Sequence, residues 1–248
     1  MSTVVVLASP PREGFVCDRL VDATPLSAAQ AAKLYAASLR DTLRTAERAG
    51  GDLLVNYLPE AELPEQYHTD TTPEAEVRTL ASEALSDVTA ARFERQVGST
   101  TAARVGNTVT HLLREEAADS VAILRPTAPL VQRADVDGGA MKLRSSSVVL
   151  GPTATGDVYH AGFTEPVEFA DALTDPATET LTARARDADL DVDFLDVQPT
   201  VDDPAGLRAV VSLVRARVRA ERVAPADTAL FVDDHGLRVR DGELVLDE

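Results

Sequence analysis

Residues 3–8 read Thr3-Val-Val-Val-Leu-Ala8, a continuous run of β-branched and aliphatic side chains near the start of a 248-residue chain. A run without alternating polar residues is typical of a strand that is buried on both faces, as in a parallel sheet. Pro10, Pro11 and Gly14 then interrupt regular structure. We therefore expect an interior strand whose carboxyl end leads into a loop.

The segment after this loop carries a helix signal. Ser27 and Gln30 have the spacing of a capping box, and apolar residues then recur at helical intervals as far as Ala49. Gly50-Gly51 favours the end of that helix, and residues 52–57 (DLLVNY) have the composition of a second strand. The order strand, helix, strand indicates the first unit of an α/β fold.

The alternation of strands and helices continues along the chain. Predicted helices span 73–85, 100–116, 131–143, 178–188 and 203–222, and predicted strands span 91–96, 120–124, 147–150, 158–163 and 192–197. This pattern favours an α/β fold with a mostly parallel central sheet and helices on both faces. We expect a single domain over 1–248, in which 208–248 forms a C-terminal extension of a helix plus a hairpin that turns at Asp241-Gly242.

The charge of the chain is strongly negative. Asp and Glu number 41 against 24 Lys and Arg, the net charge is −17, and only two of the basic residues, Lys33 and Lys142, are lysines. A cationic partner and a surface adapted to high salt would each explain this composition, and the even spread of acid along the chain favours a halophilic surface. Because no basic stripe is present to bind phosphates, we expect no nucleic-acid partner.

Cysteine content and hydropathy bear on the compartment. Cys17 is the only cysteine, so no disulfide can form within the chain, which fits a reducing environment. The apolar run at 3–8 is too short to span a membrane, and no basic segment precedes it as in a signal peptide. These features predict a cytoplasmic protein without a membrane span.

Ligands of parallel sheets bind beyond the carboxyl ends of the strands. A binding site is therefore expected in the loops that follow Ala8, Leu124, Leu150 and Val197. In the first loop, Gly14 and the backbone amides suit a phosphate or a base, and Arg19 can bind a phosphate through two hydrogen bonds. An ordinary proline-rich connection with a surface arginine explains the same residues.

The fourth loop holds two neighbouring carboxylates, Asp202 and Asp203. Carboxylate oxygens are preferred ligands of Mg²⁺ and Mn²⁺ when these ions hold a diphosphate. Asp203 followed by Pro204 is also a common start of a helix, and we prefer that role for Asp203, which leaves Asp202 as the candidate metal ligand. A different enzyme class that uses Cys17 or His160 is a further alternative.

The first loop also resembles the opening motif of a known family, a strand followed by Ala-Lys-x-Pro-x-x-Gly-x-x-Lys-Thr-Arg-Leu. The matching residues are Ala8, Pro11, Gly14, Arg19 and Leu20, while Ser9 and Cys17 stand at the lysine positions and Asp18 at the threonine position. The family is a group of GT-A-like glycosyltransferase homologues of unknown function, described as arsenosugar-biosynthesis glycosyltransferase-like. The chain resembles a divergent, halophilic member of it.

Later segments carry the resemblance further. Gln96, Gly98 and Arg104 match one family motif, and residues 125–129 match the next, with Thr127 at an aspartate position. Residues 150–163 match a third motif, in which Thr155 stands at another aspartate position, Gly156 is kept and Asp157 follows. Residues 200–207 match the last motif, in which Asp202 keeps the second aspartate. The resemblance implies a nucleotide-diphospho-sugar transferase (GT-A) fold and a glycosyl or nucleotidyl transferase that uses Mg²⁺ or Mn²⁺ with a nucleotide-sugar. It implies nucleotide contacts for Pro11, Gly14, Arg19, Arg104, Thr127, Gly156 and Asp157, and a metal contact for Asp202, without assigning a catalytic residue.

The differences from the family lie in its charged positions. Both lysines and three of four acidic positions are replaced, so a diphosphate would have to be neutralised by other groups, for which Arg12, Arg19, Arg104 and Arg125 are available. A scarcity of lysine in a halophilic chain explains the lysine changes but not the loss of carboxylates. The alternative function is therefore a catalytically inactive nucleotide- or sugar-binding or partner protein with the same scaffold. The absence of any cofactor is an open alternative to Mg²⁺ or Mn²⁺, and a homo-oligomer is compatible with either function.

Overall fold

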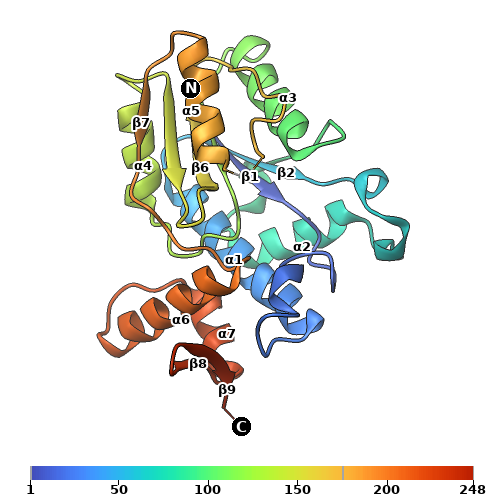
Figure 1. Ribbon diagram of the computed structural model, residues 1–248. Coiled ribbons are helices and arrows are strands. Elements are labelled where there is room, and N and C mark those ends of the chain that lie inside the picture. Colours follow the sequence, from blue (N-terminus) through green and yellow to red (C-terminus); the bar gives the residue numbers. More distant parts are fainter. Residues whose placement is uncertain (1, 175, 248) are drawn as a thin grey trace.

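The computed structural model describes residues 2–174 and 176–247. Its central sheet consists of β1 (Ser2–Ala8), β2 (Asp52–Tyr57), β3 (Arg92–Arg95), β4 (Ser120–Leu124), β5 (Val148–Pro152), β6 (Val158–Phe163) and β7 (Val192–Phe194). The strands lie in the order β3-β2-β1-β4-β6-β5-β7 (Figure 1). β6 is antiparallel to β4 and β5, and the other pairs are parallel, which confirms the predicted mostly parallel sheet.

The run that opens the chain is the interior strand β1. It pairs with β2 on one side and with β4 on the other, and Val4, Val5 and Val6 are at most 3% exposed. A strand with neighbours on both edges and helices over both faces has no solvent-facing side, which explains why the run lacks polar alternation.

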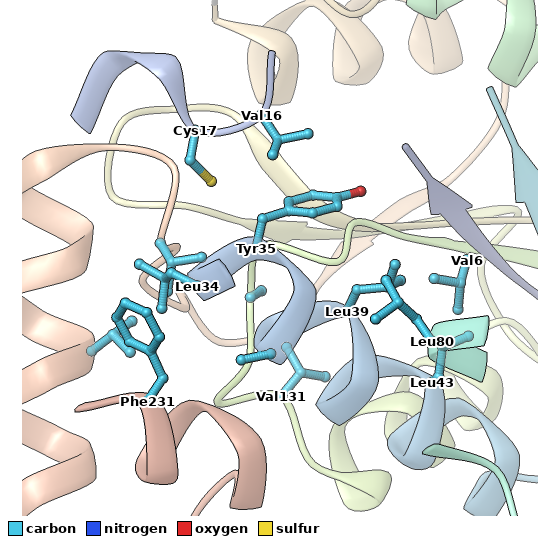
Figure 2. Packing of buried hydrophobic residues seen from close by; sticks show 14 of the residues in the cluster. Val6, Val16, Cys17, Leu34, Tyr35, Leu39, Leu43, Leu80, Val131 and Phe231 are labelled. Carbon is cyan, nitrogen blue, oxygen red and sulfur yellow. The ribbon is translucent and has the colours of Figure 1, made fainter. Parts of the chain in front are cut away.

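Helices cover both faces of the sheet, as predicted. One hydrophobic cluster packs Val4 and Val6 of β1 against α1 (Ala28–Arg48), α2 (Pro73–Ala84) and Val136 of α4 (Arg133–Lys142). The other packs Val5 of β1 against α3 (Thr101–Arg114) and α5 (Ala177–Asp187). Figure 2 shows the first cluster around the leucines of α1, with Val6 and Leu80 beside them.

The start of α1 follows its sequence signal. The Ser27 side chain accepts a hydrogen bond from the backbone amide of Gln30, and the Gln30 side chain accepts one from the amide of Ser27. The predicted capping box is therefore present, and α1 ends at Arg48, with Ala49 as its C-cap before the glycine pair and β2.

The C-terminal part packs against α1 on the same face. It consists of α6 (Pro204–Arg219), α7 (Ala226–Asp234) and the hairpin of β8 (Leu237–Arg240) and β9 (Glu243–Leu246), drawn in red in Figure 1. The hairpin confirms the prediction, whereas α7 was not predicted. Asp41 of α1 accepts hydrogen bonds from the first amides of α7, those of Asp227 and Thr228, at 3.1 and 2.8 Å.

None of the helices formed by residues 2–174 and 176–247 is both long and apolar enough to cross a bilayer.

Candidate functional site

The strand order reverses beside β1. From β1 the chain moves to β2 and β3 on one side, and it then returns to β4 on the other side. The helix after β1 (α1) and the helix before β4 (α3) lie on opposite faces. Loops that diverge in this way leave a crevice beyond the carboxyl ends of β1 and β4, where open α/β sheets bind ligands.

Two adjoining hollows occupy this crevice, an inner one of about 310 Å³ and an outer one of about 260 Å³. Tyr35, Arg125, Thr127 and Asp157 line both hollows. The inner hollow adds Ser9, Gln96, Thr101 and Arg104 to apolar walls that include Leu7, Val105, Ile123 and Leu173. The outer hollow adds Cys17, Asp18, Arg19, Thr153, Thr155, Thr200, Asp202 and Asp203.

Tyr35 connects the core to the crevice. Figure 2 shows its ring projecting from α1, with Val16 and Cys17 of the first loop to one side. The hydroxyl accepts a hydrogen bond from the backbone amide of Ser9 at 2.8 Å. Burial raises the pKa of Tyr35, so the hydroxyl keeps its proton and can donate it to a ligand.

The loop after β4 is held from three sides. The amide of Arg125 donates to the carbonyl of Tyr159, the carbonyl of Pro126 accepts from the Ser38 hydroxyl, and the carbonyl of Thr127 accepts from the amide of Val201 at 2.7 Å. The Thr127 side chain, 6% exposed, keeps a buried hydroxyl for which the described residues supply no hydrogen-bond partner. An orphaned hydroxyl beside a hollow is a group that a ligand can satisfy.

Arg125 bridges two carboxylates at the centre of the crevice. One of its guanidinium nitrogens pairs with Asp157, and the other pairs with Asp202 at 2.8 Å. Asp157 belongs to the turn between β5 and β6, and Asp202 belongs to the loop after β7. The structure therefore brings together charged groups from three of the loops in which the sequence predicted a site.

Arg104 of α3 reaches the inner hollow with little neutralisation. Its closest carboxylate, that of Glu62, lies at 3.8 Å, and the other hydrogen bonds go to Gly98 and Thr101. Burial lowers the pKa of Arg104, which Glu62 only partly opposes, and its buried Nε has no hydrogen-bond partner among the described residues. An incompletely paired guanidinium favours an anionic or carbonyl-bearing ligand.

The first loop contributes less than the sequence predicted. Arg19 lines the outer hollow, but Pro11 and Gly14 are not among the residues that line either hollow. The Gly14 carbonyl accepts a hydrogen bond from the Tyr67 hydroxyl at 2.8 Å. Arg12, which the sequence offered as a counter-ion for a diphosphate, is buried away from the hollows and pairs with Glu60 and Glu76. This loop is thus fastened to the segment after β2.

The loops that carry Asp157 and Asp202 are shaped by local backbone features. Gly156 has a φ of 86°, and it turns the chain so that Asp157 faces the crevice while Gly156 itself packs near Pro176. Asp203 accepts a hydrogen bond from the amide of Gly206 at 2.8 Å, which confirms its predicted role as the cap of α6. Asp202 is left as the carboxylate that faces Arg125.

Cys17 and His160 are poorly suited to nucleophilic or acid–base chemistry. The Cys17 thiol is buried, and burial together with the nearby Asp202 raises its pKa, which disfavours the thiolate. Burial lowers the pKa of His160 to about 4, and although the residue is among those that line the inner hollow, its ring packs close to Gly139 and Gly162. Both side chains act as packing groups.

The metal that the family resemblance implies does not fit the donors of this site. Asp157 and Asp202 are both paired with Arg125, Asp203 caps α6, and Thr127 offers only a hydroxyl. Over residues 2–174 and 176–247, no three His, Cys, Asp or Glu side chains are grouped so that they could hold a metal ion. Protein ligands alone would therefore not build a cage for Mg²⁺ or Mn²⁺ here.

Larger hollows lie elsewhere. One of about 840 Å³ lies between α3 and the segment 167–171, and one of about 1040 Å³ lies between α6 and α7. Neither is lined by Arg125 or by the loop after β1, so volume alone does not identify the site. We assign the site to the crevice because the strand order reverses there and orphaned polar groups face it.

Tyr35 is a site residue that the sequence did not single out. It appeared only as one position of the apolar face of a helix. Its hydroxyl on that face was the available signal, because a buried hydroxyl needs a hydrogen-bond partner and this helix directly follows the first interior strand.

Comparisons with known proteins support the fold. The sequence matches no protein-family model, and no curated protein is significantly similar to it. A protein proposed to be a nucleotide-diphospho-sugar transferase from Desulfovibrio desulfuricans G20 is similar with a TM-score of 0.73 and 20% identity, over 94% of each chain. A cytidylyltransferase from Leptospira borgpetersenii has a TM-score of 0.52 and 7% identity over 94% of each chain. A 4-diphosphocytidyl-2C-methyl-D-erythritol synthase from Anaerococcus prevotii has a TM-score of 0.51 and 10% identity, over 90% of this chain and 96% of that one. The chain therefore has the GT-A-like fold of nucleotide-diphospho-sugar transferases.

Proposed function

We propose that this protein is a nucleotide-sugar (glycosyl or nucleotidyl) transferase-like protein that binds its nucleotide across the inner and outer hollows. The observation that carries the proposal is the cluster of Arg125, Arg104 and the orphaned Thr127 hydroxyl at the point where the strand order of a GT-A-like sheet reverses. The fold alone supports only a nucleotide-handling protein, so the proposal depends on these side chains.

The inner hollow suits a nucleoside. Its walls combine apolar side chains with a few polar groups, among them Gln96, whose amide nitrogen donates to the carbonyl of Asn56 at 2.8 Å. This leaves the Gln96 carbonyl and the Arg104 guanidinium to discriminate the edge of a base. Apolar walls with few convergent polar groups are typical of sites for flat organic ligands.

The outer hollow suits a diphosphate with its sugar. Arg125 and Arg19 supply positive charge, and the hydroxyls of Thr153, Thr155 and Thr200 supply donors and acceptors for a sugar. In a transfer reaction negative charge develops on the departing phosphate, and guanidinium groups held by surrounding loops stabilise it. The chain's contribution to transfer would thus be binding, orientation and charge stabilisation.

A non-catalytic nucleotide- or sugar-binding protein is the second candidate. Asp157 and Asp202 are two of the carboxylates that line the outer hollow, and both are engaged by Arg125. An acceptor hydroxyl would have to displace the guanidinium to reach either of them, which favours binding without turnover.

Calorimetry with UDP, GDP, CDP and their sugars tests the proposal. We expect binding by wild type, a loss of about tenfold or more in affinity for Arg104→Gln, and no loss for Arg133→Gln, an exposed arginine of α4. Absence of binding by every nucleotide, in molar KCl with and without Mn²⁺, would refute a nucleotide function. Release of nucleoside diphosphate from a bound nucleotide-sugar distinguishes a transferase from the non-catalytic candidate.

Several finer predictions accompany this proposal. A halophilic surface predicts that the melting temperature rises with KCl, because salt screens the repulsion of a −17 chain. The division into one GT-A-like domain with a 208–248 extension, the cytoplasmic location, a homo-oligomer and the absence of a nucleic-acid partner stay predictions. So does a metal contact of Asp202, which its pairing with Arg125 opposes.

A further inference from the structure

We infer that Arg125 takes the place of a divalent cation in this site, so that the protein binds a diphosphate without metal. The inference rests on the proposed function, since it concerns how the same crevice neutralises its ligand. It also explains why the donors of the site do not fit a metal ion.

The first support is the position of the guanidinium. Arg125 lies between carboxylates from two different loops, Asp157 and Asp202, and contacts both. In a metal-dependent phosphate site one or two carboxylates hold the ion, which then binds the phosphates. Arg125 occupies the point at which such an ion would connect these two side chains, and an ion could enter only after the guanidinium moved away.

The second support is the number of donors. A guanidinium has five N–H groups in a planar fork, so Arg125 can hold two carboxylates and still donate to phosphate oxygens. The structure uses two of its nitrogens, one for each carboxylate. A lysine could not do this with the same geometry, because its ammonium group is a compact point charge.

The third support is the local charge. A divalent ion with two carboxylates is neutral, and Arg125 together with Arg19, which lines the same outer hollow, neutralises Asp157 and Asp202 to the same formal total. The other two carboxylates there, Asp203 and Asp18, accept hydrogen bonds from backbone amides and do not pair with Arg125, but they keep their charges. The hollow is thus lined by two arginines and four aspartates, and the positive charge that a diphosphate meets there comes from arginine alone.

Arg125→Ala tests the inference directly, with the nucleoside diphosphate that wild type binds most tightly as the probe. Wild type should bind it equally in EDTA and in Mn²⁺, and its Mn²⁺ electron paramagnetic resonance signal should show no protein-bound ion. The variant should lose about tenfold or more in affinity in EDTA and regain it in Mn²⁺, because the two freed carboxylates can then hold the ion with the phosphates. Wild-type binding that requires Mn²⁺ would overturn the inference while leaving the proposed function intact; no binding in either condition would instead refute the proposed function.

Asp202→Asn gives a second test, which does not depend on the folding of the arginine variant. If Arg125 is the cation, removal of a competing carboxylate should tighten metal-free binding by roughly threefold to tenfold. If a metal is the cation, loss of its ligand should weaken binding instead. Asp203→Asn is the matched control, because it removes a carboxylate of the same hollow that does not pair with Arg125 and asparagine still caps a helix. An equal gain of affinity in both variants would mean that the loss of any negative charge in the hollow has this effect, and it would count against the inference.

Discussion

The hydroxyl of Tyr35 accepts a hydrogen bond from the backbone amide of Ser9 at 2.8 Å. This contact joins the helix that follows the first strand to the residue directly after that strand, 26 positions earlier in the chain. Because Tyr35 lines both hollows, the bond also fixes the floor that they share.

Tyr35→Phe should therefore weaken binding more than it weakens folding. The loss of one hydrogen bond, at an amide that is only half-buried, should lower the free energy of unfolding by about 1 kcal/mol. Nucleoside diphosphate affinity should fall by about fivefold or more, because the start of the first loop is no longer fixed. Denaturant titration and calorimetry measure the two effects.

Tyr57→Phe is the matched control. Its hydroxyl donates to Glu74 at 2.8 Å, and its side chain does not line either hollow. A similar loss of stability without a loss of affinity is expected. Equal losses of affinity in the two variants would mean that Tyr35 acts on stability alone.

Gly206 of α6 allows the loop that carries Asp202 to lie close to the helix. A Cβ at this position would lie 2.3 Å from the carbonyl oxygen of Thr200 and 2.6 Å from a carboxylate oxygen of Asp203. Gly206→Ala should therefore displace the loop that carries Asp202, lower the free energy of unfolding by about 2 to 3 kcal/mol and weaken nucleotide binding. Thermal unfolding and calorimetry would show both effects.

Gly138→Ala is the matched control, because Gly138 also lies within a helix but the opposite effect on stability is expected. A Cβ at Gly138 of α4 would meet nothing within 4 Å. Alanine should stabilise the helix by up to about 1 kcal/mol and leave binding unchanged. If Gly206→Ala were as harmless as Gly138→Ala, the close contact with Thr200 would be refuted.

The Cys17 thiol should react slowly in the folded protein. It is buried, and its pKa is raised by burial and by the charges of Asp202 and Asp18. Iodoacetamide at pH 8 should label the native protein at least about tenfold more slowly than the protein in guanidinium chloride. Cys17→Ala should keep nucleotide binding, whereas fast native labelling that nucleotide blocks would indicate cysteine chemistry in the crevice.

Local patterns predicted most of the elements, and the exception has a physical cause. The capping box at Ser27 and the uninterrupted apolar run of β1 are signals contained within a few residues. The start of α7 has no such signal, because Pro225 stands at its N-cap without a side-chain hydrogen bond. Its first amides are held instead by Asp41, 186 residues earlier in the chain, and no local pattern can reveal that contact.

The sequence predicted the region of the candidate site but not the ion pairs that form within it. The rule that ligands bind beyond the carboxyl ends of strands located the loops that contain Arg125, Asp157 and Asp202. These aspartates are 32 and 77 residues from Arg125 along the chain, so their pairing depends on the order of strands in the sheet. The position of β6 between β4 and β5 brings their loops together, and the sequence did not specify that order.

His160 is a buried imidazole without a hydrogen-bond partner for either nitrogen among the described residues. It is 1% exposed, and its ring lies against Gly139 of α4 and Gly162 of β6. These glycines leave the space that the ring fills. Burial lowers the pKa of His160 from 6.5 to about 4, so the folded protein excludes a proton that the unfolded chain binds.

The pH dependence of stability should therefore carry the signature of His160. Because the pKa in the folded state is lowered, stability is fully present above about pH 6.5 and is lost as the pH falls toward 4, to a total of about 3 kcal/mol. His160→Leu should remove this loss between pH 6.5 and 4 and should keep or raise stability at pH 7, because an apolar side chain leaves no orphaned nitrogen. His111→Gln, at a histidine that is 47% exposed, should retain the loss. Denaturant titrations at half-unit intervals of pH measure it, and a curve of His160→Leu that parallels wild type would show that other groups cause the acid sensitivity.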